Sequence, residues 1–200
     1  YTVELAAEEA KPAPSRVQLS YLHNGLGLAL SNAGLYDKAL AHYQKDLEIL
    51  LKQLGPEHPD VATSYNNIGG VHVSKAEYDK ALEHYQKSLA IDLKQLGPEH
   101  PAVATSYNNI GFVHYEKGEY DKTLEHYQKS LAIKLKQLGP EHPSVAISYN
   151  NIGFVHGKKG EYDKALEHYQ KALAILLKQL GPEHPSVATS YNNIGLGHHT

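Results

Sequence analysis

A segment of 42 residues returns along this chain almost unchanged. It occupies 55–96, 97–138 and 139–180, and each copy opens with Gly-Pro-Glu-His-Pro. A period between about 20 and 50 residues is typical of solenoids, in which each unit buries its apolar face against its neighbours. The period therefore predicts an array rather than a single globule, and it favours a function in which the chain holds another protein.

A divergent repeat precedes the three close copies, and half a repeat follows them. A shift of 42 residues aligns Tyr36-Asp37-Lys38 with Tyr78-Asp79-Lys80, which places the first repeat at about 15–54. Residues 181–200 carry only the first helix of a further repeat. Residues 1–14 are polar, contain two prolines and do not fit the pattern, so we expect a flexible leader or a fragment of another domain. The sequence predicts one solenoid over 15–200.

Each repeat contains the pattern of two helices. Pro59 suits the first turn of a helix, and apolar positions then recur with helical spacing at Val61, Tyr65, Ile68 and His72. A second helix is expected from about 77 to 96, where Gly97 and Pro98 end it. The chain should then contain nine helices.

The turn between the two helices differs in one copy. Gly118 and Gly160 stand in Lys-Gly-Glu, where a residue with positive φ can close the preceding helix. Ala76 takes this place in the remaining close copy. We expect Ala76 to strain or remodel the cap.

The repeat resembles the tetratricopeptide pattern. The matching residues in the second repeat are Tyr65, Ile68-Gly69, Ala81, Tyr85 and Ser88. The 42-residue form, with His-Pro-x-Val-Ala and Tyr-Asn-Asn-Ile-Gly, is most similar to the repeats of kinesin light chains. This resemblance implies an all-α α-solenoid, a right-handed superhelix of antiparallel helix pairs. It does not imply a motor role, because the heptad segment that pairs light chains with heavy chains is absent.

The copies differ mainly on one face of the first helix of each repeat. The changing positions fall within an arc of about 140°, opposite the apolar stripe. In tetratricopeptide arrays the free face of this helix lines a concave groove, so the resemblance implies a ligand surface here. The alternative is that solvent-facing positions drift freely after duplication. The predicted groove residues are Thr63, Gly70, Val73, Ser74, Thr105, Phe112, Tyr115, Glu116, Ile147, Phe154 and Lys158.

Asparagine pairs lie within the same face and do not change in the later copies. Asparagine costs about 0.5 kcal/mol against alanine inside a helix, so two in succession need a compensating interaction. A carboxamide can donate to and accept from the backbone of an extended peptide, which predicts ligand binding. A ladder of bonds between adjacent repeats is an equal alternative. The predicted groove residues of this kind are Asn66, Asn67, Asn108, Asn109, Asn150 and Asn151.

The fourteen histidines are predicted to be structural. His58, His72 and His84 recur once per repeat, whereas a catalytic site needs one convergence of nucleophile, base and orienting group. Neighbouring helices lie about 8–10 Å apart, while zinc requires nitrogen ligands at about 2.0–2.1 Å. The sequence therefore predicts no catalytic residues, no metal site and no cofactor.

Composition restricts the partners further. The formal charge of −3, with positive and negative residues interspersed, argues against a nucleic-acid partner. The sequence contains no run of 18 apolar residues, which argues against a membrane span. The absence of cysteine favours an intracellular, cytoplasmic location. Because the chain begins at Tyr1 and lacks methionine, we expect a processed or engineered part of something longer.

These observations favour a non-enzymatic scaffold that binds a peptide segment of a partner protein in the groove. One alternative is a structural or self-assembling array without a peptide ligand, and another is a regulatory array detached from an enzyme domain. End-to-end self-association is also predicted, because both ends should expose apolar helix faces. These faces consist of Leu19, Leu22, Leu26 and Leu30 at one end and Val187, Tyr191 and Ile194 at the other.

Overall fold

The computed structural model describes residues 1–11 and 16–197, and these residues form helices without strands. The helices pack consecutively as the predicted α-solenoid class requires, so the fold class is confirmed. The chain divides into two compact units, residues 1–97 and 98–200, and each is described by itself. A single superhelix over 15–200 stays a prediction.

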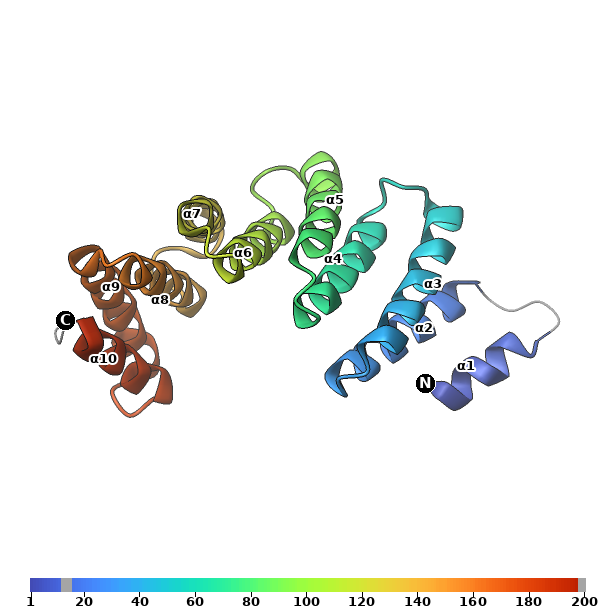
Figure 1. The fold of residues 1–200 in the computed structure, drawn as a ribbon, viewed down its shortest axis with the longest axis horizontal. Coiled ribbons are helices and arrows are strands. Elements are labelled where there is room, and N and C mark those ends of the chain that lie inside the picture. Colours follow the sequence, from blue (N-terminus) through green and yellow to red (C-terminus); the bar gives the residue numbers. More distant parts are fainter. Residues whose placement is uncertain (12–15, 198–200) are drawn as a thin grey trace. The chain divides into compact units, whose positions relative to one another are not determined.

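Unit 1 contains a short helix and two antiparallel helix pairs. The short helix is α1 (Thr2–Glu9), and the pairs are α2 (Arg16–Asn32) with α3 (Tyr36–Leu54) and α4 (Pro59–Ser74) with α5 (Tyr78–Leu96). Helix α3 also packs on α4, so the second helix of one repeat contacts the first helix of the next (Figure 1).

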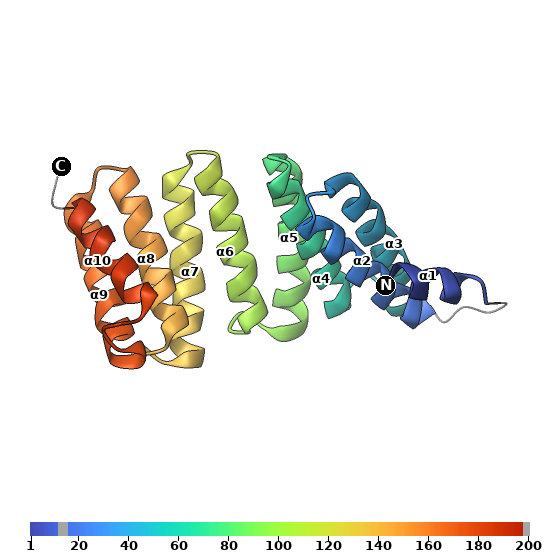
Figure 2. The ribbon, with the colours of Figure 1, turned by 90° about the horizontal axis from the view of Figure 1, so that it is seen from below.

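Unit 2 repeats this arrangement and ends in half a repeat. It contains α6 (Pro101–Glu116), α7 (Tyr120–Leu138), α8 (Pro143–Lys158), α9 (Tyr162–Leu180) and α10 (Pro185–Gly197). Figure 2 shows α6 to α10 running alternately up and down through this unit. The last helix was predicted within residues 181–200, and residues 198–200 of this range, which include His199, lie outside the described residues.

A histidine begins the first helix of each later repeat. His58 Nδ1 accepts a hydrogen bond from the Asp60 backbone N–H at 3.2 Å, and Pro59 occupies the first turn. The N–H groups in the first turn of a helix have no acceptor within the helix, and the His58 side chain supplies one of them with an acceptor. This arrangement recurs at His100, His142 and His184.

The helix-pair turn has the same backbone in all four complete repeats. Ala76 adopts φ +56°, close to the +73° of Gly118. The Ala76 N–H bonds Val73 O at 2.8 Å, and the Gly118 N–H bonds Tyr115 O at 2.9 Å. The cap is therefore kept rather than remodelled, and Ala76 adopts the left-handed backbone that favours glycine.

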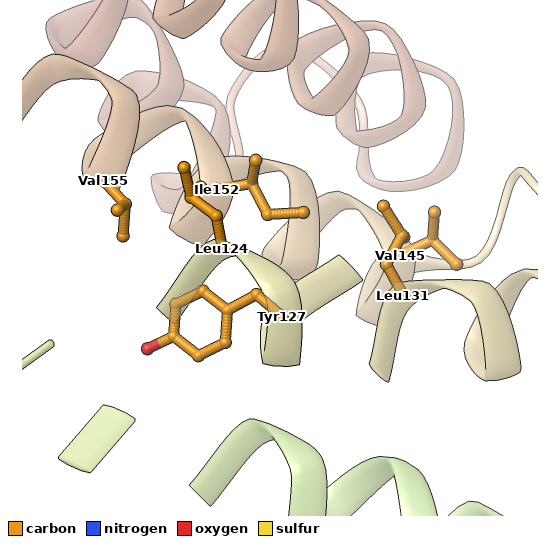
Figure 3. Close-up of a cluster of buried hydrophobic side chains, with 6 residues drawn as sticks. All are labelled: Leu124, Tyr127, Leu131, Val145, Ile152 and Val155. Atoms are coloured by element: carbon orange, nitrogen blue, oxygen red, sulfur yellow. The ribbon is translucent and has the colours of Figure 1, made fainter. Parts of the chain in front are cut away.

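The core of each repeat depends on a tyrosine that packs against a glycine. A Cβ at Gly111 would lie 2.7 Å from the Tyr127 ring, so only glycine lets α6 and α7 approach this closely. Tyr127 also belongs to a buried cluster between α7 and α8 (Figure 3). The other members are Leu124, Leu131, Val145, Ile152 and Val155.

The 42-residue period aligns Tyr107 of α6 with Tyr65 of the predicted apolar stripe, which predicts a buried ring, but Tyr107 is only half-buried, so this prediction is wrong. The Tyr107 ring lies 5.9 Å from the His126 ring, and Lys129 Nζ lies 5.6 Å from its centroid. Tyr107 therefore covers the outer edge of the α6–α7 pair, and Tyr127 fills its interior.

The beginning of the chain is also more ordered than predicted. Residues 2–9 form α1 instead of a flexible leader, which makes ten helices in the described residues rather than nine. Leu5 of α1 packs on Leu22 and Leu26, so these leucines are buried and do not form the exposed end that we expected. At the other end Val187 is buried while Tyr191 is 54% exposed.

Candidate functional site

The predicted groove residues all lie on the first helices of repeats, and none of them is buried. On α4 these are Thr63, Asn66, Asn67, Gly70, Val73 and Ser74. On α6 and α8 they are Thr105, Asn108, Asn109, Phe112, Tyr115, Glu116, Ile147, Asn150, Asn151, Phe154 and Lys158. The opposite side of each helix supplies the core, as the periodicity requires.

Unit 2 gathers part of this set into a hollow of about 340 Å³ between α6 and α8, which we call the aromatic hollow. The Tyr115 ring lies 6.4 Å from the Phe112 ring and 5.6 Å from the Phe154 ring. Phe112 and Phe154 remain 40% and 45% exposed. Asn108 and Asn151 add amide groups to its lining, so the hollow combines apolar surface with hydrogen-bonding groups.

The polar groups around the aromatic hollow favour a ligand that combines apolar and polar groups. Lys158 Nζ lies 5.3 Å from the Phe154 ring centroid, within the range of a cation–π interaction. Burial, and then the nearby Tyr120 and Glu116, raise the pKa of the Tyr115 hydroxyl, which therefore stays protonated at neutral pH. The hydroxyl can donate a hydrogen bond to a bound segment.

A second kind of hollow occurs where two repeats meet, and we call these hollows the junction pockets. Their volumes are about 450 Å³ among α2, α3 and α4, about 210 Å³ among α6, α7 and α8, and about 390 Å³ among α8, α9 and α10. Each includes predicted residues: Thr63 lines the first, Thr105 and Ile147 the second, and Ile147 and Asn150 the third.

The sequence prediction missed the contribution of the second helices to these pockets. Asp46 and Leu50 line the first, Lys134 lines the second, and Leu176 lines the third. The signal was present, because positions 50, 92, 134 and 176 are related by the 42-residue period yet carry Leu, Asp, Lys and Leu. Comparing the copies along the second helix would have found it.

The asparagine pair divides into two environments. Asn150, the first of its pair, donates from Nδ2 to Ser190 Oγ on α10 at 3.4 Å, which agrees with the ladder alternative. Its equivalent in the first repeat, Asn24, donates to Asp46 Oδ2 at 3.3 Å. Asn151, the second of the pair, lines both the aromatic hollow and the third junction pocket. The asparagines that line the aromatic hollow are therefore Asn108, the first of its pair, and Asn151, the second of its pair.

Other predicted residues do not converge. Asn109, Glu116 and Lys158 line neither the aromatic hollow nor a junction pocket, although Lys158 contacts a ring of the hollow. In unit 1, the predicted α4 residues after Thr63 are likewise outside the first junction pocket. The surface is therefore more continuous in unit 2 than in unit 1.

The histidines inside the second repeat have structural partners. His72 Nδ1 lies 2.7 Å from Glu77 Oε2, and His84 Nδ1 lies 2.8 Å from Lys80 O. The two rings pack 5.2 Å apart. Within the described residues, no group of three or more His, Cys, Asp or Glu side chains is placed to hold a metal ion. The same part of the chain contains no helix that is long and apolar enough to span a membrane.

Comparisons with known proteins agree with the repeat geometry. The family profile of the tetratricopeptide repeat matches four overlapping stretches, residues 18–94, 61–136, 102–178 and 145–200. No curated protein matches the sequence.

Several solved structures share the fold. One is BtubC (BKLC) from P. vanneervenii, with a TM-score of 0.84, 21% identity, and coverage of 98% of this chain and 79% of that one. Another is a Podosopora anserina protein with nearly identical TPR-like repeats, provisionally assigned as a kinesin light chain. Its TM-score is 0.78, with 25% identity and coverage of 90% and 85%. The MamA protein has a TM-score of 0.61, with 20% identity and coverage of 90% and 81%. The similarity to the kinesin light chain class is thereby confirmed.

Proposed function

Since this chain belongs to the tetratricopeptide repeat family, whose repeats generally mediate protein–protein interaction, we propose that it is a scaffold that binds a segment of a partner protein. Within each unit, the exposed faces of the first helices are the surface to which such a segment binds. Tetratricopeptide arrays are typically non-enzymatic, and we propose the same for this chain.

The aromatic hollow is the observation that supports this proposal most directly. Phe112 and Phe154 are the only phenylalanines of the chain, and both are partly exposed on one hollow, where the Tyr115 ring contacts each of them. Exposed aromatic side chains beside amide groups are characteristic of anchoring positions at protein interfaces. A core function would instead have buried them.

A variant that loses partner binding but keeps its fold would support the proposal. Partners captured by the full chain should be lost when Phe112 and Phe154 are both replaced by serine, while helicity and the urea midpoint stay nearly unchanged. The matched control is Tyr162→Ser, because Tyr162 is 41% exposed on α9, outside the hollow. This variant should keep the partner.

A photo-crosslinking residue at position 112 then identifies the segment that is bound. We expect crosslinks from position 112 to one short stretch of the partner, and none from position 162. A partner that the double serine variant retains, or one that crosslinks equally from both positions, would show that the hollow is not the binding surface.

Self-assembly is a second candidate, and the exposed Tyr191 of the last helix favours it. The equivalent Tyr149 packs with its ring centroid 6.0 Å from that of His168, whereas Tyr191 of α10 is 54% exposed. Exposed repeat faces can form head-to-tail contacts. Sedimentation from micromolar to near-millimolar protein should show association that Tyr191→Glu removes. A strict monomer over that range would eliminate this candidate.

A further inference from the structure

The first junction pocket of unit 1 has a carboxylate at its base. Asp46 is 1% exposed, and it lines a hollow of about 450 Å³ together with the apolar side chains of Leu50, Leu54 and Tyr21. Asp60 lies at the same pocket with a side chain that is 62% exposed. The pocket is therefore apolar along its walls and negatively charged at two points.

Neutral groups hold the Asp46 carboxylate in place. Ser20 Oγ donates to Oδ1 and Ser64 Oγ donates to Oδ2, both at 2.5 Å, while Asn24 Nδ2 donates to Oδ2 at 3.3 Å. A carboxylate offers about four acceptor sites, so one remains after these three bonds. No cationic side chain among the described residues forms an ion pair with Asp46. Its charge is thus buried, oriented and not neutralised by a cation.

The equivalent pockets of unit 2 have different charges. In the second pocket Lys134, at the position of Leu50, donates to Ser148 Oγ at 2.9 Å, and burial lowers the pKa of its ammonium group. In the third pocket Ala172 and Leu176 replace Asp46 and Leu50. The three pockets share one backbone arrangement, yet their charges are negative, positive and neutral.

We infer that the first junction pocket is a subsite for a lysine or arginine side chain of the partner segment. The long aliphatic stem of such a side chain fits the apolar walls, and its charged end reaches the free acceptor site of Asp46. Charge-assisted hydrogen bonds are stronger than neutral ones, and a buried charge is most stable when it is paired. An acidic side chain would be repelled by Asp46 and Asp60. The inference rests on the proposed function, because the cationic side chain belongs to a bound segment of a partner protein.

Small probes can test the pocket without knowledge of the partner. n-Butylguanidinium imitates the end of an arginine side chain, and n-butylurea has nearly the same shape without the charge. In amide NMR spectra of the full chain, the cation should cause saturable shifts at Ser20, Asn24 and Ser64, about tenfold tighter than the urea. The amides of Ser144 and Ser148, beside Lys134, should not respond.

The chain itself supplies matched variants. Asp46→Ser introduces the residue found at positions 88 and 130, and Leu50→Lys introduces the one found at 134. Each should weaken n-butylguanidinium binding at least about tenfold. Leu50→Lys keeps the Asp46 hydrogen bonds, so it remains informative if Asp46→Ser unfolds. Conversely, Ser130→Asp with Lys134→Leu should transfer cation binding to the second pocket.

Three results would overturn the inference: equal binding of n-butylurea, shifts of the same size at the Lys134 pocket, or unchanged cation binding in folded Leu50→Lys. These outcomes do not depend on partner capture. If the partner is retained through Phe112 and Phe154 but the cation fails to bind, only the subsite is wrong. If the cation binds but no partner depends on the hollow, only the proposed function is wrong.

Discussion

Ala76 is the residue at which the repeats of this chain allow a local strain energy to be measured. Among the described residues other than glycine, Ala76 has a positive φ, at +56°. Its equivalents in the other complete repeats are Gly34, Gly118 and Gly160. A left-handed backbone costs an L-residue about 1–2 kcal/mol. Replacing Ala76 by glycine removes this cost. Glycine, however, loses more chain entropy on folding, which offsets about 0.4–1 kcal/mol of the stabilisation. We therefore expect Ala76→Gly to stabilise the chain by about 0.5–1 kcal/mol.

The reverse change supplies the control. A Cβ at Gly118 would meet nothing within 4 Å, so Gly118→Ala tests the backbone alone. Gly118→Ala should destabilise the folded chain by about the same amount, because the two caps have nearly the same geometry. The N–H groups of Ala76 and Gly118 form equivalent hydrogen bonds of 2.8 and 2.9 Å.

Urea unfolding measures the change in the free energy of unfolding for both variants. Thermal unfolding should show shifts in Tm of about 1–4 °C in opposite directions. Hydrogen exchange at the Glu77 amide, which bonds His72 O at 2.9 Å, reports on the cap itself and should slow in Ala76→Gly. If Ala76→Gly is neutral or destabilising while Gly118→Ala is harmless, positive φ stores no strain here and the reasoning is wrong.

Three further predictions concern the core of unit 2. Tyr127→Ala should cost about 3–5 kcal/mol in urea unfolding, because Tyr127 is 6% exposed, whereas half-buried Tyr107→Ala should cost less than half of that; equal losses would contradict the assigned packing. Gly111→Ala should destabilise, and a Tyr127→Leu background should relieve the clash with the ring 2.7 Å away; an unchanged midpoint in Gly111→Ala would contradict this close approach. Burial, then His114 and Lys129, lower the pKa of His126 below 6.5, so the unfolded chain takes up the proton first. Stability should therefore fall as the pH drops below about 6.5, and His126→Gln should reduce this slope in urea midpoints measured across that range; an unchanged slope would refute the assignment.

The sequence predicted the helix pairs well because their signals are local and repeated. Pro59 and Gly97 lie at the boundaries of their helices, and the apolar spacing gave the buried face of α4. The position of Ala76 was predicted from its glycine equivalents, and the structure agrees.

The misses depend on contacts that no local pattern contains. Helix α1 has eight residues, and its burial of Leu5 exists only against Leu22 and Leu26 of α2. Tyr107 has the spacing of a core residue, but the glycine opposite Tyr127 decides which ring fills the interior. For the candidate surface, the exposed faces were predicted, whereas the junction pockets require the second helix of one repeat and the first helix of the next.

The contact between Asp46 and Ser20 has a consequence for how this chain finds its native pairing during folding. Copies this similar can exchange helices, so that α3 could close on the first helix of a later repeat. Position 20 is serine only in the first repeat, and its equivalents are Ala62, Ala104 and Ala146. A pairing shifted by one repeat would place Ala62 beside Asp46, and the carboxylate would lose a hydrogen bond that contributes about 1.5–3 kcal/mol. Buried polar contacts are best known for fixing register, and this one favours the pairing of α3 with α2 over a pairing of α3 with the first helix of a later repeat.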